Sequence, residues 1–360
     1  MNLTAGTPLQ NGKYVINHVL GQSVLSVTLQ GMQVQSNRPV VLKTLKQNPQ
    51  VKVDFTQLKQ RFTEQVSRFA QCQHPGLVRL VDSFEEADLP FAVMDYTVGQ
   101  TLLDIVQTSG PRSEEQAVRY IKQVGSALDE IHQHGLIHRD VTPKNIICLS
   151  GSESVVLVNF GITHPAVLGW SDGFAHPPAG NYAAIEQYQP QLSPTPTTDV
   201  YSLAGTLYFL LTGHAPVAAP LRHRSPLLLP QQFCPDLNLA IASAILKGLE
   251  LNPKSRPQTV ATWLSLLAAD QVLLPANLGS SPSHALPQAS ANGNSKSVLP
   301  ESNSSLNGKT VSSPLPSPSS NVKQPVVVQS TRKQSISTPS LKHPFFKTLV
   351  TVSAIALSWV

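Results

Sequence analysis

The chain has 360 residues, enough for one large or two ordinary domains with a sizeable core. Lysine and arginine outnumber aspartate and glutamate by 26 to 21, which gives a net charge of +5. From residue 275 onward there are seven basic residues and one acidic residue, so the first 274 residues are close to neutral. This distribution argues against a basic nucleic-acid-binding domain, and we expect no nucleic acid partner. It favours attraction of the C-terminal part to an anionic membrane surface.

Two further features favour a cytoplasmic domain. The three cysteines, Cys72, Cys148 and Cys234, are odd in number and far apart in apolar stretches, as is typical of reduced core residues. The first residues lack a charged stretch followed by an apolar run, so we expect no signal peptide.

The first hundred residues predict a small β-rich lobe. Residues 54–73 carry apolar side chains at a helical period, which predicts one helix. Five β-rich runs, separated by glycine, proline or acidic turns, predict strands over residues 14–20, 24–30, 40–43, 77–84 and 90–96.

The next part of the chain predicts longer helices. Ser113 opens a helix with Gln116 as its capping partner, and Gly135 ends it. Residues 154–158 predict a strand, and residues 199–213 are apolar on nearly all sides, as expected of a buried central helix.

A polar loop joins the helix that ends at Gly135 to this strand. It contains His138-Arg139-Asp140 and, five residues after the aspartate, Asn145. A carboxylate and a carboxamide on such a loop can point into one cleft, one as a base and the other as a metal ligand, as phosphoryl transfer requires. The alternatives are an ordinary polar turn, or a metal site of His132, His134 and His138 that no cysteine or carboxylate set completes.

The loop resembles the catalytic loop of protein kinases, H-R-D-x-x-x-x-N. With the landmarks described below, the chain is similar to bacterial, cyanobacterial-like serine/threonine protein kinases over residues 14 to about 270. The resemblance implies an α+β, two-lobed kinase-like fold, with a small β-rich N-lobe over 14–97 and a larger helical C-lobe over 98–270. Asp140 would then orient a substrate hydroxyl, Asn145 would hold Mg²⁺, and Lys144 would supply the charge of a lysine that Thr142 replaces.

The resemblance also implies an ATP site. Lys43 matches the lysine of the V-A-I-K strand, which holds the phosphates, and Glu64, counted back from His74-Pro75, would be its ion-pair partner. An edge-strand lysine and a surface glutamate are the alternatives. Only Gly21 remains of the glycine-rich loop, and two serines make that lid bulkier. The residues implied to contact ATP are Gly21, Ser23, Ser26, Thr28, Val41, Lys43, Glu64, Asp95 and Thr97.

The departure with the largest chemical consequence is Asn159-Phe160-Gly161, where kinases have Asp-Phe-Gly. Asn159 is uncharged, so with Asn145 it would form a weakened site for Mg²⁺ or Mn²⁺. Residues 162–186 resemble the activation loop and end at Glu186, whose structural partner in the family corresponds to Arg256. We therefore expect a pseudokinase that signals by binding ATP and a protein partner. The alternative is a slow, active serine/threonine kinase that phosphorylates a protein substrate.

The C-terminal part has a different composition. Residues 275–343 are rich in Ser, Pro, Asn and Gln, which predicts a disordered linker. Residues 345–360 are apolar apart from Lys347, which favours a short or truncated membrane anchor over docking on protein, although a full span needs about 20 residues. We therefore expect a cytoplasmic kinase-like domain that is associated with the membrane through its C-terminal part. A membrane-tethered adaptor is a second alternative function.

Overall fold

The computed structural model describes residues 3–48, 54–160, 179–189 and 191–267. They lie within one compact unit that ends at Ser281. The predicted linker at 275–343, the apolar segment at 345–360 and most of the predicted activation loop, 161–178, lie outside the described residues. In the ranges that are described, no helix has both the length and the apolar character needed to cross a membrane.

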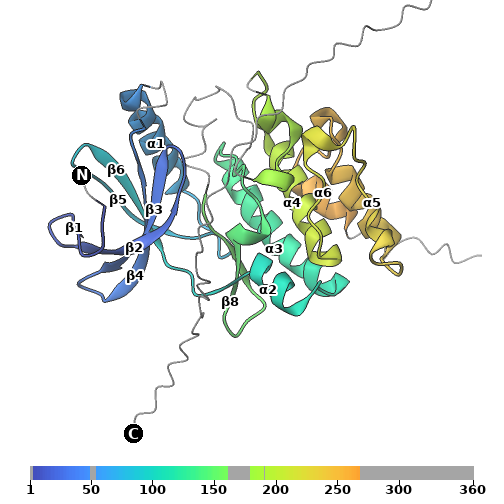
Figure 1. Cartoon of the computed structure of the whole chain (residues 1–360), viewed down its shortest axis with the longest axis horizontal. Coiled ribbons are helices and arrows are strands. Elements are labelled where there is room, and N and C mark those ends of the chain that lie inside the picture. Colours follow the sequence, from blue (N-terminus) through green and yellow to red (C-terminus); the bar gives the residue numbers. More distant parts are fainter. Residues whose placement is uncertain (1–2, 49–53, 161–178, 190, 268–360) are drawn as a thin grey trace, which may run out of the picture. The chain divides into compact units, whose positions relative to one another are not determined.

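The N-terminal lobe is a six-stranded antiparallel sheet with one helix, α1 (Phe55–Phe69), packed against it (Figure 1). The strand order is β1-β2-β3-β4-β6-β5. All five predicted strands are present, and a short first strand that the sequence did not indicate is added. The strands are β1 (Pro8–Leu9), β2 (Tyr14–Gln22), β3 (Ser26–Gln33), β4 (Arg38–Leu45), β5 (Leu80–Glu86) and β6 (Leu89–Asp95).

The alternation of side chains along β4 separates core from cleft. Val40 and Leu42 point to one face and pack in a cluster with Tyr14. Val41 and Lys43 point to the other face, where they line the cavity described below. One strand thus anchors the outer core and presents a lysine to the inside of the domain.

The C-terminal lobe is helical. Its central helix, α4 (Pro196–Thr212), is buried along nearly its whole length, as its sequence predicted. Ser113 accepts a hydrogen bond from the backbone N–H of Gln116, which confirms the predicted start of α3. The other elements are α2 (Leu102–Ser109), α3 (Glu114–Gln133), α5 (Leu239–Gly248), α6 (Val260–Leu266) and a small sheet of β7 (Gly99–Thr101), β8 (Ile146–Leu149) and β9 (Val155–Leu157).

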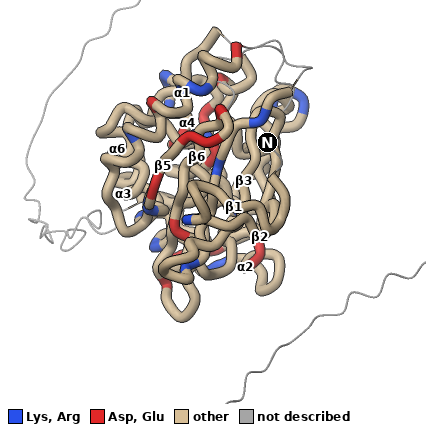
Figure 2. The backbone as a smooth tube through the Cα atoms, turned by 90° about the vertical axis from the view of Figure 1, so that its left-hand side faces the viewer, with Lys and Arg blue, Asp and Glu red and all other residues tan. Residues whose placement is uncertain are grey.

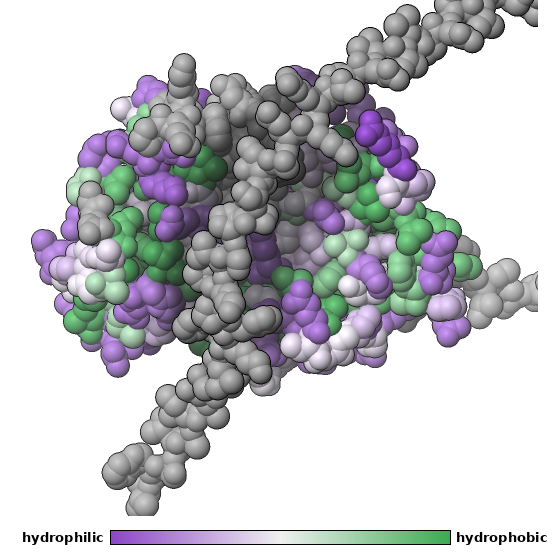
Figure 3. Space-filling model, viewed as in Figure 1, coloured by the Kyte–Doolittle hydropathy of each residue, from purple (hydrophilic) through white to green (hydrophobic). Residues whose placement is uncertain are grey.

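Both signs of charge are distributed over the described residues. Figure 2 shows acidic positions along the β5–β6 hairpin and basic positions scattered among the other elements. On the face seen in Figure 3, hydrophobic and hydrophilic residues alternate in small patches. This mixed surface agrees with the near-neutral charge of the first 274 residues.

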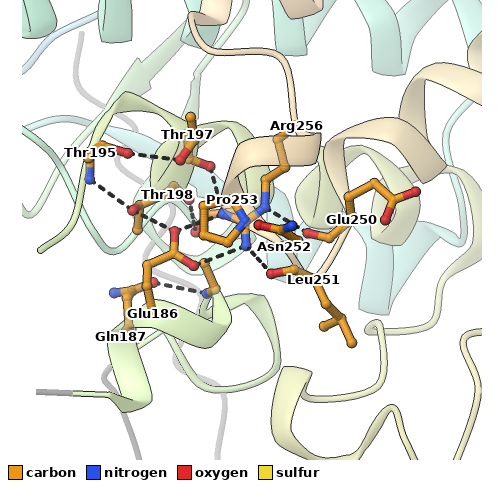
Figure 4. A network of polar contacts seen from close by, with 12 residues as sticks. Glu186, Gln187, Thr195, Thr197, Thr198, Glu250, Leu251, Asn252, Pro253 and Arg256 are labelled. Carbon is orange, nitrogen blue, oxygen red and sulfur yellow. Dashed lines mark hydrogen bonds and ion pairs between the residues drawn. The ribbon is translucent and has the colours of Figure 1, made fainter. Parts of the chain in front are cut away.

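A buried ion pair ties the C-terminal lobe together (Figure 4). Arg256 Nη1 and Nη2 donate to Glu186 Oε1 and Oε2 over 2.7 and 3.0 Å. Thr198 also donates to Glu186, and the remaining guanidinium protons reach the backbone carbonyls of Thr197, Glu250 and Leu251. The predicted partnership of Glu186 and Arg256 is present, and every polar atom of the pair has a partner.

Candidate functional site

A cavity of about 480 Å³ lies between the two lobes, a size typical of small-molecule sites. Apolar side chains form most of its wall and a few polar groups converge on one end. Nine of the predicted site residues line it: Gly21, Thr28, Val41, Lys43, Asp95, Thr97, Lys144, Asn145 and Asn159.

Sequence reasoning missed the apolar part of the wall. These residues are Leu20, Val78, Met94, Tyr96, Gly99, Thr101, Ile147 and Val158. One carried a signal: Gly99 closely follows Asp95 and Thr97, which were expected to contact ATP, and a Cβ built at Gly99 would lie 2.1 Å from the carbonyl oxygen of Cys148. A side chain at this position would force β7 away from β8 and open the floor of the cavity.

Ser23 and Ser26, which were expected to contact ATP, are not among the residues that line the cavity. Their hydroxyl oxygens lie 2.7 Å apart, and Ser23 Oγ also accepts from the backbone N–H groups of Leu25 and Ser26. The serines therefore close the turn between β2 and β3 on itself. The reason is the short reach of the serine hydroxyl, which finds backbone donors within its own turn.

Glu64 does not pair with Lys43 either. It is exposed on the outer side of α1, where its carboxylate accepts from Gln60 Nε2 over 3.3 Å. The cause is the position of Glu64 around the helix. Phe62 and Val66 are buried, and each lies two residues from Glu64. Side chains two residues apart point about 200° apart around a helix, so Glu64 points away from the buried side.

The residue on the inner side of α1 is Gln65. It is half-buried, three residues after Phe62 and four before Phe69, so it shares their face. Phe69 in turn stacks on Phe160 with ring centroids 4.4 Å apart. The buried side of α1 thus carries the carboxamide of Gln65, whereas the predicted carboxylate of Glu64 lies on the exposed side.

The catalytic-loop residues are held by α4. Asp199 accepts from the backbone N–H groups of His138 and Arg139, each over 2.8 Å, and its other contact is His132 Nε2 at 2.8 Å. Burial alone would raise the pKa of Asp199, but the hydrogen bond and charge of His132 hold that pKa below its ordinary value. The carboxylate therefore stays ionised and fixes the backbone just before Asp140.

A second support comes from Gln187. Its Nε2 donates to the carbonyl oxygen of Arg139 over 2.9 Å, and its Oε1 accepts from the backbone N–H of Ala184. Arg139 has a φ of +67°, a left-handed conformation that costs free energy for a residue with a side chain. The contacts of Gln187 and Asp199 maintain that conformation, which orients Asp140.

At the polar end of the cavity, Asn159 connects the predicted catalytic residues. Its Oδ1 accepts from Lys43 Nζ over 3.0 Å. Its Nδ2 donates to Asp140 Oδ2 over 3.4 Å and to Asn145 Oδ1 over 3.3 Å. The structure thus brings Lys43, Asp140, Asn145 and Asn159 together, as the sequence predicted.

These contacts do not fit the expected metal site. The oxygen of Asn159 faces the ammonium of Lys43, and its NH₂ group faces Asn145 Oδ1, the oxygen of the other predicted metal ligand, and Asp140 Oδ2. No cluster of three or more His, Cys, Asp or Glu that could hold a metal ion occurs among the described residues. This also leaves the histidine alternative without support in that part of the chain.

Burial changes the ionisation of both charged residues in this group. It lowers the pKa of Lys43 from 10.5 to about 8, against the opposing charge of Asp140. It raises the pKa of Asp140, against the charges of Lys144 and Lys43 and a hydrogen bond from Asn145. Lys43 therefore carries its charge at neutral pH at a cost in free energy, because no carboxylate of the described residues lies at ion-pair distance.

Replacing Lys43 by methionine is expected to stabilise the nucleotide-free protein by about 1–2 kcal/mol at pH 7. Because the pKa of Lys43 is lower in the folded protein than in the unfolded chain, its charge reduces the free energy of unfolding of wild type by roughly 3 kcal/mol below pH 8. Methionine removes this penalty, but it also removes the hydrogen bonds of the lysine, which offsets part of the gain in stability. The penalty is relieved between pH 8 and 10.5, so wild type and variant should converge in urea unfolding as pH rises. Lys46→Met, at an exposed hydrogen bond to Gln22, is the control. A destabilised Lys43→Met protein would contradict the account.

Comparison with known proteins decides the family. Residues 14–252 match the protein kinase domain. The chain belongs to the protein kinase family. The serine/threonine-protein kinase PknB of Mycobacterium leprae is 31% identical over 267 residues, which are 71% of this chain and 42% of that protein. A probable serine/threonine-protein kinase of Clostridium acetobutylicum is 27% identical over 279 residues, 73% of this chain and 40% of that protein. The chain thus spans less than half the length of these kinases.

Solved structures show the same fold. The apo form of PpkA-294 has a TM-score of 0.59 at 24% identity and covers 74% of this chain and 99% of its own. Rad53 residues 1–466 in complex with AMP-PNP have a TM-score of 0.57 at 22% identity, covering 70% of this chain and 64% of their own. The predicted two-lobed kinase fold is therefore confirmed.

Proposed function

We propose that this serine/threonine kinase-like domain is a pseudokinase that binds ATP in its cleft and signals by binding, without efficient phosphoryl transfer. The observation that carries the proposal is the orientation of Asn159, whose amide N–H groups point at Asp140 and Asn145. An uncharged hydrogen-bonded amide here removes the fixed negative charge with which the family holds Mg²⁺ beside the transferred phosphate.

The ATP-binding half of the proposal rests on the cavity. Its volume suits a nucleotide, its walls are apolar, and Lys43 and Lys144 line its polar end. When bound, ATP would supply the phosphates that Lys43 attracts, and the hinge at Asp95–Thr97 would face the base. Arg79 donates two hydrogen bonds, of 2.8 and 3.3 Å, to the side chain of Asp95.

A slow kinase remains the second candidate, and one observation favours it. Asp140 Oδ1 makes no hydrogen bond to any described residue, so it would be available as an acceptor for a substrate hydroxyl if the cleft opened to expose this buried oxygen. Thr142, however, is buried where the family has a lysine and brings no charge to this oxygen.

The test is transfer of the γ-phosphate of ATP to the protein itself and to a generic serine/threonine substrate, for wild type and Asp140→Ala. We expect ATP to raise the melting temperature of wild type, and transfer by wild type to stay at the background level of Asp140→Ala. Transfer by wild type that Asp140→Ala abolishes would establish the slow kinase. The absence of any nucleotide-dependent stabilisation would remove ATP from the proposal and direct the search to protein partners.

The C-terminal segment enters the proposal only through its sequence. Its net charge of +6 from residue 275 onward and its apolar end support contact with an anionic membrane, and an adaptor role would depend on that contact. Binding of the full chain to vesicles with and without an acidic lipid would test it.

A further inference from the structure

We propose that the cleft binds its nucleotide as the free anion and does not require a divalent cation, because the side-chain oxygens of the two predicted metal ligands, Asn145 and Asn159, both accept hydrogen bonds from N–H donors. This inference deepens the proposed function and rests on it. It names the ionic form of the ligand, which sets this domain apart from kinases that use a metal–nucleotide complex.

The orientation of the Asn159 amide follows from its partners. Lys43 has only N–H donors, so the atom that faces it at 3.0 Å must be the oxygen. The NH₂ group then faces Asp140 Oδ2 and Asn145 Oδ1. The oxygen of Asn145, a predicted metal ligand, and a neighbouring oxygen of Asp140 thus each accept a hydrogen bond from Asn159.

A cation can enter only at the cost of this network. Mg²⁺ demands near-octahedral oxygen ligands and gives up its water reluctantly. If the Asn159 amide turned to offer its oxygen to a cation, its NH₂ group would face the ammonium of Lys43. Both groups are hydrogen-bond donors, so neither could accept from the other. The positive φ of Asn159, +59°, also limits the other positions that its side chain can reach.

The cleft has the charge to bind phosphate by itself. Of the three Lys43 N–H donors, two reach Asn159 Oδ1 and the Phe160 carbonyl oxygen, which leaves one for a phosphate oxygen. A phosphate near Lys43 also relieves the cost of its buried charge. Free ATP is more negative than its magnesium complex, so the attraction to Lys43 is larger for the free form.

The test compares ATP affinity of the full chain by calorimetry in EDTA and in excess Mg²⁺. Wild type should bind in EDTA with an affinity equal to or above that in Mg²⁺, within about threefold. Asn159→Asp should show the reverse, with at least about tenfold tighter binding in Mg²⁺, because its carboxylate would face Asp140 and Asn145 and need a cation between them. Mg²⁺ alone should then raise the melting temperature of Asn159→Asp and leave wild type unchanged.

Asn37→Asp is the matched control, since Asn37 is exposed in a turn with a φ of +47° and lies away from the cavity wall. It should behave as wild type. Wild-type binding that is tenfold or more tighter in Mg²⁺ would overturn this inference and leave ATP binding intact. No binding in either condition would overturn both the inference and the ATP-binding part of the proposed function.

Discussion

Arg256→Ala is expected to remove about 3–5 kcal/mol from the free energy of unfolding, a large fraction of the stability of an ordinary domain. Arg256 and Glu186 are 0% and 2% exposed at their side chains, and the two groups share two parallel hydrogen bonds. Removing the arginine leaves the Glu186 carboxylate buried with, among the described residues, the Thr198 hydroxyl as its one side-chain donor, and three backbone carbonyls lose their bond to Arg256. Urea unfolding followed by circular dichroism measures the loss.

Two controls separate the buried charge from the arginine itself. Arg119→Ala removes an exposed pair with Glu115 and should cost less than about 1 kcal/mol. The double variant Arg256→Met with Glu186→Leu should lose less than Arg256→Ala, because no unpaired charge stays buried. A loss for Arg256→Ala as small as that for Arg119→Ala would show that the pair contributes little.

Asn159→Asp is expected to raise γ-phosphate transfer about 100- to 1000-fold in Mg²⁺. The estimate follows from the roughly 3–4 kcal/mol that one fixed electrostatic contact to the transferring phosphate typically supplies. The substituted carboxylate would lie beside Lys43, Asp140 and Asn145, so the metal ligand that the family uses would be restored next to the buried ammonium of Lys43. Asp140 keeps one unpartnered oxygen for the substrate, counted over the described residues.

Initial rates of phosphate transfer by Asn159→Asp, with and without the additional change Asp140→Ala, provide the measurement. The gain should vanish in the double variant and in EDTA. Equal, background rates in Asn159→Asp and wild type would contradict this prediction and mean that the remaining departures, among them Gln65 on α1 and Thr142 in the loop, are together sufficient to block transfer.

The order of landmarks along the chain was enough to predict the fold. Lys43, the His138-to-Asn145 loop, Asn159 and Glu186 follow one another at family spacing, and the structure places the first three around one cavity end. Helix boundaries with clear caps, such as Ser113, were also predictable because the capping hydrogen bond is local.

The error at Glu64 shows where counting fails. The residue was placed by its distance from His74-Pro75, and a miscount of one residue rotates a helical side chain by about 100°. The buried stripe of Leu58, Phe62, Val66 and Phe69 carried the correct phase and points to Gln65. A periodicity argument was therefore more reliable here than a distance along the chain.

The serines and Asn159 illustrate a different limit. That Ser23 closes its own turn, and that Asn159 donates to Asp140 and Asn145, depends on which donor each oxygen meets in space. A sequence fixes the inventory of donors and acceptors, whereas the pairing among residues more than a hundred positions apart, such as Lys43 and Asn159, requires the assembled cleft.

The most direct test of the central claim is the fate of ATP bound to the wild-type chain under single-turnover conditions, with protein in excess over γ-labelled nucleotide. The account predicts that the nucleotide is recovered as intact ATP over a period in which Asn159→Asp converts it to ADP and phosphoprotein. Conversion by wild type that is lost in Asp140→Ala would contradict the account and identify a working kinase.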